Sequence, residues 1–566
     1  MLPKALTCAL FGLTVVASAA ARPVQVMPGV TYEHRLEWTA AGPVSTYVIT
    51  APKPGGLYSL TPLLSNGTIT GRETVSSMER RVSGQITTIG VNGDFFNWLG
   101  GWPTGLLMQG GVVEHHPAER RSAVGIDSAG MLHVGRVPWS ASWRGFSSLT
   151  YPIAELNEPP RPNAAALFTP AWGASTPPIN GVAAVLEPFP PALPYRDLVG
   201  DVTSLVTSGS VPIPRDGAVL VGRGSAGQAL LDDAPVGGQI TLRLGLRADW
   251  TGVTNAVGGG PALVQDGRPI RPSQSGEALT TVQLYGRDPR TAIGQRADGS
   301  LVLVAADGRE PGWSVGVTNW DLALTLIRYG CISGFALDSG GSTTVALEGH
   351  VLNRPSDPSG ERPVGEALVI GYTGVYVPGI APTLSPNGDG RGDREQLSYK
   401  LVRPSTVSAK LVAPDGTSRE LDAGQKPPGR YRFTWNGTDA AGAPAVEGRW
   451  HWSVTAVDDL DRTSTAERTF TVDRTLGFVR VSRSARMISF TLTRDATIRV
   501  TIETRSGEIL RTVATGPRAA GTVTIRWNGR DGRRRRVAPG TYLVHVAATS
   551  TIGGTQLRVP VLIRRS

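Results

Sequence analysis

The sequence predicts an α+β domain built on a mixed sheet with few helices, followed by two all-β sandwiches. Glycine and proline are abundant, at 70 and 43 of 566 residues, and short alternating stretches outnumber helical patterns. The clearest helical pattern runs from Thr318 to Gly330. Further on, the tripeptide Trp-Asn-Gly at Trp435 recurs at Trp527, an offset of 92 residues, which indicates two tandem domains of similar size.

Residues 1–21 have the pattern of a secretory signal. Lys4 supplies the positive start, Ala5 to Val16 the apolar run, and Ala17 to Ala21 the small residues of a cleavage site. The apolar run is too short to span a bilayer and no later segment offers a second candidate, so no membrane span is expected. We therefore expect a secreted or cell-surface protein, and its oligomeric state stays open.

Cysteine content and charge limit the class of protein further. Cys8 falls inside the predicted signal, which leaves Cys331 alone in the remaining chain, so no intramolecular disulfide is expected. The formal net charge of +10 favours anionic surroundings such as phosphate-bearing wall polymers. Nucleic acid is not an expected partner, because no recognition motif accompanies the charge. The densest basic run, Arg533–Arg536, is expected at an exposed hairpin tip.

Residues 22–376 are expected to form the first domain. It opens with half-buried strands at Thr31–Trp38 and Ser45–Thr50, where apolar and polar residues alternate. A short helix is predicted at Thr74–Arg81, and an apolar run predicts a buried strand at Ile86–Val91.

Two consecutive histidines, His115 and His116, lie in a predicted hairpin from Gly110 to Pro117. Because consecutive strand residues point to opposite faces, these two are not expected to reach one metal ion. No HExxH motif or Cys/His spacing indicates a metal elsewhere. The sequence therefore predicts no catalytic metal, and a loosely held divalent cation, Ca²⁺ or Mg²⁺, stays open as a cofactor.

The middle of the domain contrasts an irregular segment with regular strands. Residues 157–178 are rich in proline and alanine and have little periodicity, which predicts an extended surface insertion. Strands return from Val182 to Arg247. In the helix that follows, Thr318 or Asn319 is a candidate N-cap and Gly330 a candidate end.

The stretch with the most functional information follows the apolar run Ile332–Leu337, which is long enough for one buried strand. The run stops at Asp338, and Gly340, Gly341, Ser342 and Thr343 come shortly after it. A carboxylate followed by glycines brings backbone amides close to an anion. The alternative is a β-turn capped by Asp and Ser, with no ligand.

Three other stretches also place polar residues or glycines beside apolar runs. Asn92 and Asp94 follow the strand that ends at Val91, and glycines 258–260 separate two apolar segments. Arg290 comes just before another short strand. Each pattern is ordinary by itself, so their order and spacing carry the argument.

In this order and spacing the four stretches resemble the phosphodiester glycosidase family, over about Gly29 to Tyr372. The resemblance includes Gly71–Val75 and Glu361–Val364. One position departs from the family pattern, because Ser339 stands where the family usually has the first glycine of Asp-Gly-Gly-Gly-Ser. If that position has φ > 0, serine costs about 1 kcal/mol there.

The resemblance implies hydrolysis of a sugar-1-phosphodiester of the N-acetylglucosamine-1-phosphodiester type. The leaving phosphate is already acidic, so the site must mainly hold its charge and stabilise an oxocarbenium-like sugar. Arg290 is the candidate for the phosphate, with a structural arginine as the alternative. Asp94 and Asp338 are the candidates for stabilising the sugar cation, activating water or attacking C1, or for holding a divalent cation. The expected substrate-binding residues are Asn92, Gly258, Gly259, Gly260, Gly340, Gly341, Ser342 and Thr343.

Residues 377–474 and 475–566 are expected to form two immunoglobulin-like sandwiches. They resemble the immunoglobulin-like domain of the flagellar hook-capping protein family, and Ser385–Asp393 matches the motif that often opens such domains. The acidic residues of this motif either hold Ca²⁺ or form a structural Asx turn. Trp435 and Trp527 are expected in the cores of the two domains.

Three functions follow from this reading. The first is a secreted hydrolase that cleaves sugar-1-phosphodiester bonds in surface glycans or cell-wall polymers, with an anionic glycan as its substrate. The second is a non-catalytic glycan-binding protein that uses the same fold, which the serine at position 339 keeps open. The third is a structural adhesin whose function lies in the two repeats.

Overall fold

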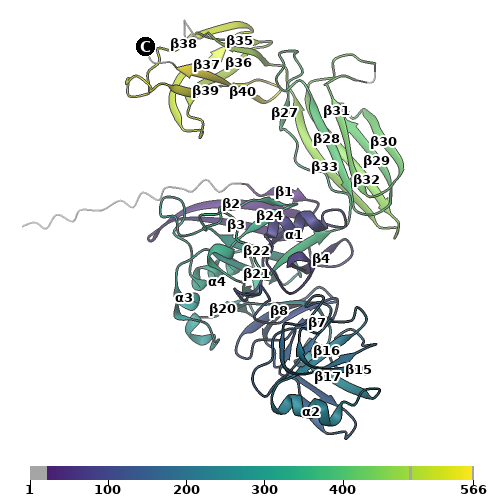
Figure 1. Ribbon diagram of the computed structural model, residues 1–566. Coiled ribbons are helices and arrows are strands. Elements are labelled where there is room, and N and C mark those ends of the chain that lie inside the picture. The colour runs from purple at the N-terminus through teal and green to yellow at the C-terminus, as the bar shows by residue number, and fades with distance from the viewer. Residues whose placement is uncertain (1–21, 440, 483–486, 564–566) are drawn as a thin grey trace, which may run out of the picture. The chain divides into compact units, whose positions relative to one another are not determined.

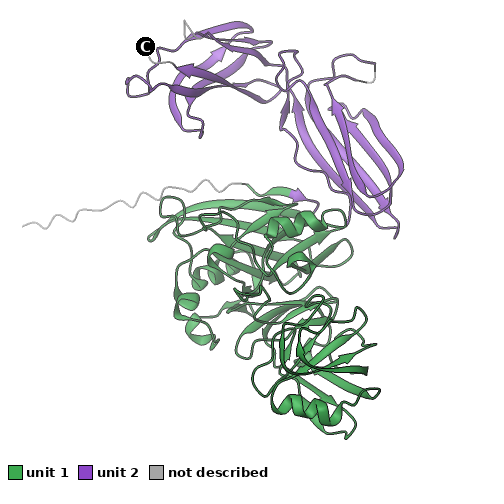
Figure 2. Ribbon diagram, viewed as in Figure 1, with its two compact units in different colours: residues 1–25, 29–372 green, residues 26–28, 373–566 purple. Residues whose placement is uncertain are grey.

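The computed structural model describes residues 22–439, 441–482 and 487–563, so the predicted signal at 1–21 lies outside the described residues. In these ranges no helix is long and apolar enough to cross a membrane. The chain divides into two compact units (Figure 2). Unit 1 comprises residues up to 25 and 29–372, and unit 2 comprises residues 26–28 and 373–566. Strands dominate both units and helices are few, as the sequence predicts.

The first eight-stranded sheet of unit 1 carries one side of the candidate site. Its order is β1-β2-β3-β22-β21-β23-β19-β20. Figure 1 labels β1, β2, β3, β22, β21 and β20 of this sheet. These strands are β1 (Val24–Met27), β2 (Val30–Thr39), β3 (Gly42–Ala51), β22 (Leu301–Ala306), β21 (Arg290–Arg296), β23 (Cys331–Ala336), β19 (Ala262–Gln265) and β20 (Arg268–Pro269). The predicted strands at Thr31–Trp38 and Ser45–Thr50 are β2 and β3, which pair antiparallel.

The predicted helix at Thr318–Gly330 is α4 (Asn319–Arg328), and it packs on this sheet. Thr318 is the N-cap: its hydroxyl accepts a hydrogen bond from the backbone N–H of Asp321, and the Asp321 side chain accepts one from the N–H of Thr318. Leu322 and Leu326 are buried in one core with strand residues of the sheet. The helix therefore packs on the sheet that holds Arg290, at the start of β21, and that leads to Asp338, shortly after β23. The other α-helices in the described residues are α1 (Val75–Val82), α2 (Ser225–Asp233) and α3 (Thr281–Tyr285).

A five-stranded sheet carries the other side of the candidate site, in the order β25-β24-β5-β26-β4. Its strands are β25 (His350–Val351), β24 (Val345–Leu347), β5 (Thr87–Asn92), β26 (Glu366–Tyr372) and β4 (Tyr58–Leu64). The predicted buried strand at Ile86–Val91 is β5, all of whose residues are buried. The helix α1 begins after Thr74, whose hydroxyl caps it, and buries Val75 and Met78 against this sheet.

The remaining two sheets of unit 1 share one apolar core. The five-stranded one has the order β7-β6-β18-β8-β9, formed by β7 (Val112–His115), β6 (Leu107–Gln109), β18 (Val253–Gly258), β8 (Ser122–Asp127) and β9 (Leu132–Arg136). The eight-stranded one has the order β11-β10-β17-β15-β14-β16-β13-β12. It is formed by β11 (Thr150–Pro152), β10 (Ser140–Arg144), β17 (Gln239–Gly245), β15 (Asp197–Gly209), β14 (Ile179–Leu186), β16 (Ala218–Gly222), β13 (Ala165–Phe168) and β12 (Glu155–Leu156).

The prediction of an extended surface insertion at 157–178 is wrong. All four residues of β13 are buried, and the strand pairs antiparallel with β16 and parallel with β12. Asn157 is also buried, and its side chain bonds Thr169 and the carbonyl oxygen of Glu114. The segment lacks period-two alternation because its strand is buried on both faces.

Unit 2 holds two β-sandwiches with separate cores. In the first, β27 (Thr383–Leu384), β33 (Thr463–Val472), β32 (Gly448–Asp458), β29 (Ser405–Val412) and β30 (Ser418–Lys426) form one sheet, and β28 (Glu395–Leu401) and β31 (Gly429–Trp435) the other. In the second, the sheets are β34 (Leu476–Val481), β35 (Met487–Leu492) and β38 (Gly521–Arg526), and β37 (Ile509–Arg518), β36 (Ala496–Glu503), β39 (Gly540–Thr549) and β40 (Gly554–Ile563).

The repeated tryptophans have the same role in both sandwiches. Trp435 and Trp527 are buried, and each indole N–H donates to the carbonyl oxygen three residues later, at 2.7 Å to Thr438 and 3.0 Å to Arg530. They are core residues, as predicted. The basic run Arg533–Arg536 lies exposed in the connection between β38 and β39, also as predicted.

The acidic loop that opens the first sandwich is a network of Asx turns. The Asp393 carboxylate accepts from the backbone N–H groups of Asn387, Gly388 and Gly390, at 2.6–3.0 Å. Asp389 accepts from the N–H of Arg391 at 2.8 Å. Backbone amides engage these carboxylates, which favours the structural alternative over Ca²⁺ binding.

Candidate functional site

The ends of three strands meet at the candidate site. In the five-stranded sheet that holds β5 and β26, Asn92 at the end of β5 pairs with Ala367 near the start of β26. Gly93 then links Glu366 to Asp338. Its N–H donates to the carbonyl oxygen of Glu366 at 3.0 Å, and its own carbonyl oxygen accepts from the N–H of Asp338 at 2.9 Å. Asp338 follows β23 of the other sheet, so these bonds join the two sheets at the acidic residues.

Asn92 holds the backbone of Asp338 in place. Its side-chain N–H donates to the carbonyl oxygen of Asp338 at 2.9 Å, and its side-chain oxygen accepts from the Thr291 hydroxyl at 2.7 Å and the Thr344 N–H at 3.3 Å. The residue is fully buried. Both ends of the amide are engaged by the protein, which favours a positioning role over the substrate contact expected from the sequence.

Asp94 is a buried carboxylate beside a guanidinium. Its Oδ1 accepts from the Phe95 N–H at 2.7 Å and lies 3.4 Å from Nη1 of Arg121. Burial raises the pKa of Asp94, and the charge of Arg121 opposes that rise. Gly105 and Gly258 pack directly against the carboxylate: a Cβ on Gly105 would lie 2.7 Å from Oδ2, and one on Gly258 would clash with the same atom. Gly258 therefore contributes by making room for Asp94.

Asp338 has a pKa near neutrality. Burial raises the pKa of its carboxyl to about 7, and the nearby charge of Asp94 acts in the same direction. Hydrogen bonds from the Ser342 hydroxyl and the Ser339 N–H, the latter at 2.7 Å from Oδ1, oppose the rise. A carboxyl with this pKa can exchange protons at physiological pH.

Glu366 is a third acidic residue at the site, and the sequence did not reveal it. Its Oε1 accepts from the Asp94 N–H at 2.6 Å, whereas its buried Oε2 has no hydrogen-bond partner among the described residues. Burial raises the pKa of Glu366 well above its usual value, and the charges of Asp94 and Asp338 add to the effect. Burial therefore favours the protonated form of this carboxyl. The signal was weak: a charged residue opens an otherwise apolar strand.

The turn after Asp338 tolerates serine without backbone strain. Ser339 has φ −130° and ψ −177°, which is extended backbone, so the expected cost of replacing glycine does not arise. Gly340 is the residue with positive φ, at +70°, and a Cβ there would lie 2.7 Å from Nη2 of Arg309. A Cβ on Gly341 would clash with the Arg362–Asp357 pair. The second and third positions of the turn, not the first, therefore require glycine.

Two of the backbone N–H groups that were expected to bind an anion are already hydrogen-bonded within the protein. The N–H of Gly260 donates to the Ala336 carbonyl at 2.8 Å, and that of Gly340 donates to the Pro289 carbonyl at 2.9 Å. Gly259 and Gly260 have φ of +151° and +124°, so their turn requires glycine for conformational reasons. The amides of Gly260 and Gly340 thus serve the fold.

The two hydroxyl residues after the glycines lie in the interior. Ser342 and Thr343 are buried, and the Ser342 hydroxyl accepts from Nη1 of Arg362 at 3.4 Å. The hydroxyl of Thr343 has no hydrogen-bond partner in the described part of the chain. The Ser342 hydroxyl thus bonds both the Asp338 carboxyl and the Arg362 guanidinium.

Arg290 has partners different from those expected. Its guanidinium is buried and donates to three carbonyl oxygens, those of Gly286 at 2.7 Å, Val282 at 3.2 Å and Val317 at 3.3 Å. Burial lowers the pKa of Arg290 to about 10, with the charges of Asp288 and Asp338 opposing. Arg290 lies within electrostatic reach of Asp338, but its fork holds the end of α3, which favours the structural alternative.

Other cations lie closer to the acidic residues. Arg362 donates to Asp357 at 2.7 and 2.8 Å, and its charge lowers the pKa of Asp338. It also lines a cavity of about 520 Å³ together with the exposed ring of Trp98. Arg362 and Arg72 lie over that ring, at 5.2 and 5.6 Å from its centroid. The cavity is lined by Gly71, Arg72, Trp98, Leu99, Gly100, Asp357, Ser359, Arg362 and Pro363.

His115 and His116 do approach one point, contrary to the expectation from strand alternation. His115 is the last residue of β7 and His116 follows it, so the alternation ends between them. Their rings stack with centroids 4.5 Å apart, and both Nε2 atoms face Glu158. Burial lowers the pKa of His116 to about 3, with the neighbouring His115 acting in the same direction.

Different parts of the chain match different protein families. Residues 198–371 match the phosphodiester glycosidase family, and residues 389–459 and 481–551 each match the FlgD Ig-like domain. The first match includes Arg290, Asp338 and Glu366, whereas Asp94 precedes it.

Individual relatives cover short stretches. The SPbeta prophage-derived uncharacterized protein YomE of Bacillus subtilis is 40% identical over 121 residues, which is 21% of this chain and 18% of that protein. The human N-acetylglucosamine-1-phosphodiester alpha-N-acetylglucosaminidase is 40% identical over 68 residues, 12% of this chain and 13% of its own length. The matched segments thus span less than a fifth of either relative.

A solved structure supports the fold alone. A hypothetical protein from Synechocystis superposes with a TM-score of 0.52 at 24% sequence identity. The superposition covers 61% of this chain and 62% of the Synechocystis protein.

Proposed function

We propose that unit 1, which carries a phosphodiester glycosidase domain followed in the chain by two FlgD Ig-like domains, hydrolyses sugar-1-phosphodiester bonds. The substrate class we propose is an N-acetylglucosamine-1-phosphodiester or a related anionic sugar phosphate in surface glycans or cell-wall polymers. The name of the human relative supports the sugar and the bond. The secretory pattern of residues 1–21 supports action outside the cell.

The observation that carries the proposal is the convergence of three buried carboxyl groups beside cations. Asp94, Asp338 and Glu366 come from three strand ends; the charge of Asp94 raises the pKa of the other two, and that of Asp338 raises the pKa of Glu366. Arg121 stands beside the first, and Arg362 acts on the second. Burying acidic groups together costs stability, so a cluster of this kind is more typical of a reaction site than of a core.

The three carboxyls suit different steps of the reaction. Arg121 opposes the burial that raises the pKa of Asp94, so we assign Asp94, in its ionised form, to stabilising a sugar cation. Asp338, with a pKa of about 7, suits attack at C1 or the activation of water. Burial favours the protonated form of Glu366, and its buried Oε2 has no partner among the described residues, so Glu366 can donate a hydrogen bond to a sugar or phosphate oxygen.

The phosphate needs positive charge, which we assign to the cavity beside the turn. Arg72 and Arg362 line that cavity, and guanidinium groups bind phosphate through two parallel donors. Trp98 offers an exposed aromatic ring for an apolar sugar face. Arg362 connects the cavity to Asp338 through the Ser342 hydroxyl.

The test is release of free sugar from UDP-N-acetylglucosamine or a wall-polymer fragment by the purified protein. We expect turnover by the wild type and a loss of at least about 100-fold in kcat/KM in Asp94→Asn and Asp338→Asn, because each removes a charge that acts in the transition state. The matched control is Asp232→Asn, since Asp232 is exposed on α2. We expect this variant to retain wild-type activity.

Two other outcomes would separate the alternatives. Binding of the sugar phosphate without turnover would contradict the hydrolase and support a glycan-binding protein. Turnover that persists in both site variants would contradict our assignment of residues. Since Ser339 has extended backbone, the departure from the family pattern no longer argues for a non-catalytic domain.

A further inference from the structure

A second polar cluster in unit 1 consists of His115, His116 and Glu158. Their ligand atoms lie within 4.8 Å of one another. Nε2 of His115 is 3.5 Å, and Nε2 of His116 3.6 Å, from the same carboxylate oxygen, Oε2 of Glu158. Two atoms that bind one ion tetrahedrally at about 2.1 Å lie about 3.4 Å apart, so both separations fit a shared ion.

The tautomer of His115 is fixed by its surroundings. Its Nδ1 lies 2.8 Å from the carbonyl oxygen of Gly105 and 3.0 Å from that of His116. Both atoms are acceptors, so Nδ1 carries a proton, and the neutral ring has a bare lone pair on Nε2. That Nε2 is buried without a hydrogen-bond partner among the described residues, and it faces an acidic oxygen. Two facing lone pairs repel unless a cation lies between them.

His116 can complete the same arrangement. Its Nδ1 lies 3.3 Å from the backbone nitrogen and 3.4 Å from the carbonyl oxygen of Leu156. In the tautomer that leaves Nε2 free to bind a cation, Nδ1 carries the hydrogen and donates a hydrogen bond to that carbonyl oxygen. Histidine ligands of metals typically donate their second N–H to a backbone carbonyl in this way. The guanidinium of Arg161, whose charge also acts on Glu158, pairs with Glu155 at 2.6 Å. Oε2 of Glu158 faces both histidines.

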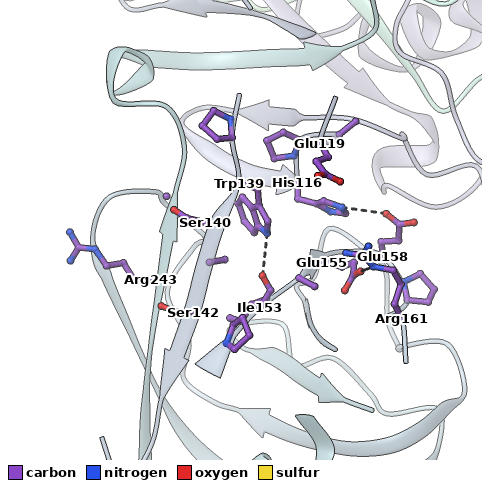
Figure 3. A pocket seen from close by; sticks show the side chains of 18 residues that line it. His116, Glu119, Trp139, Ser140, Ser142, Ile153, Glu155, Glu158, Arg161 and Arg243 are labelled. Atoms are coloured by element: carbon purple, nitrogen blue, oxygen red, sulfur yellow. Dashed lines mark hydrogen bonds and ion pairs between the residues drawn. The ribbon is translucent and has the colours of Figure 1, made fainter. Parts of the chain in front are cut away.

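The cluster stands at the wall of a cavity of about 880 Å³, to which His116 and Glu158 both contribute (Figure 3). The figure shows the ring of His116 pointing toward Glu158, with Trp139 on its other side. An ion held by two imidazoles and one carboxylate keeps a fourth position open. In this chain that position would face the cavity and take a water molecule or another oxygen ligand.

We propose that His115, His116 and Glu158 bind one transition metal ion of the Zn²⁺ class. Two nitrogen ligands and one oxygen ligand suit Zn²⁺, Co²⁺ or Ni²⁺, and they are a poor set for Ca²⁺ or Mg²⁺, which prefer oxygen. The three ligands do not include Asp94, Asp338 or Glu366, but the two sites adjoin, because His115 bonds the carbonyl oxygen of Gly105 and Gly105 packs against the Asp94 carboxylate. Metal binding can be measured without the hydrolase activity.

The test is metal binding by the full chain, purified without a polyhistidine tag and stripped with a chelator. Addition of Co²⁺ should give one bound ion per chain with a visible absorption spectrum typical of low coordination number, and Zn²⁺ should displace it. We expect His116→Gln and Glu158→Gln each to weaken Co²⁺ binding at least about tenfold, since each removes a ligand. Metal should also raise the thermal unfolding temperature of the wild type, because it binds the folded state.

The matched control is His133→Gln. His133 also pairs with a carboxylate, Asp127, at 2.9 Å, but has no second histidine beside it. This variant should bind Co²⁺ like the wild type. Glu158 is partly exposed, so its glutamine variant should fold, and circular dichroism checks that it does.

The proposal is overturned if the wild type binds no Co²⁺ or Zn²⁺. It is also overturned if folded Glu158→Gln and His116→Gln bind as tightly as the control. Calcium as the only ion that raises the unfolding temperature would contradict the ligand set.

Discussion

At the scale of single residues, the candidate site is dominated by the electrostatics of buried carboxyl groups. Asp94, Asp338 and Glu366 all have raised pKa values because burial disfavours their charged forms, and the charge of Asp94 raises the pKa of the other two further. Only Asp94 has a guanidinium directly beside it. The charge of Arg121 opposes the raised pKa of Asp94, burial favours the protonated form of Glu366, and the pKa of about 7 lets Asp338 titrate near neutral pH.

The first prediction concerns the stability of the Asp338→Asn variant as a function of pH. The pKa of Asp338 is about 7 in the folded chain, against about 3.9 for an unfolded aspartate. Because the folded value is raised, the wild type loses stability as pH rises from the unfolded value to about 7. Asparagine has no such loss. The variant should match the wild type near pH 4 and exceed its stability, on the order of 3 kcal/mol, near pH 8.

Thermal unfolding at a series of pH values measures this difference. Asp232→Asn is the control, because exposed Asp232 should leave the pH dependence of the wild type unchanged. A stability difference between Asp338→Asn and wild type that stays constant with pH would contradict a raised pKa. The same titration should make kcat/KM rise as pH increases through about 7, if ionised Asp338 is the reacting form.

At the scale of elements, Arg290 is the first residue of β21 and connects that strand to the short helix α3. Its guanidinium bonds the carbonyls of Val282 and Gly286 at α3 and that of Val317 just before α4. Three buried carbonyls thus depend on one planar group with donors in fixed directions. This arrangement positions the connection between β21 and the helices, rather than offering a free fork to a phosphate.

The second prediction is that Arg290→Lys lowers stability more than substrate affinity. Lysine keeps the charge but cannot reach three carbonyls, so the free energy of unfolding should fall by about 2–3 kcal/mol. KM for the phosphodiester should change little. The control is Arg328→Lys, an exposed arginine that pairs with Glu37 at 3.2 Å, where the change should stay within about 0.5 kcal/mol.

Denaturant unfolding and steady-state kinetics on the same preparations check both parts. A variant with unchanged stability and a strongly raised KM would restore Arg290 as the phosphate ligand. Loss of both stability and kcat would leave Arg290 as a positioning residue, as the structure favours.

Elements with local signals could be predicted from the sequence, and those fixed by distant partners could not. Thr318, Asp321 and Gly330 encode the start and end of α4 within one segment, and the helix forms between them. In contrast, β13 has no alternation, and its burial depends on pairing with β16, some fifty residues later. The strand ends at Asp94 and Asp338 could be recognised because polar residues interrupt apolar runs.

The same distinction explains the errors at the site. The role of Glu366 depends on the N–H of Asp94, 272 residues earlier in the chain. No local pattern encodes such a contact. The carbonyl groups that accept from Arg290 lie at α3 and just before α4, so no local pattern indicated these hydrogen bonds either. The prediction for the two histidines failed for a local reason, because β7 ends at His115 and alternation applies only within the strand.

At the scale of the whole molecule, the chemistry and the repeats belong to different units. All residues of the carboxyl cluster and of the histidine cluster lie in unit 1, and the two sandwiches form unit 2. Each unit has apolar cores of its own. Separate cores favour units that fold independently, so activity and any attachment to surfaces are separable by experiment.

The third prediction is that residues 22–372 alone retain the hydrolase activity. Because the carboxyl cluster is built entirely within unit 1, the fragment should keep kcat/KM within about threefold of the full chain. Residues 373–566 should release no sugar. Asp338→Asn in the fragment is the control for a contaminating hydrolase, and near-ultraviolet circular dichroism checks that both fragments are folded. A folded but inactive 22–372 fragment beside an active full chain would mean that unit 2 takes part in catalysis. Surface attachment reproduced by 373–566 alone, with no turnover by any form of the protein, would instead favour the adhesin.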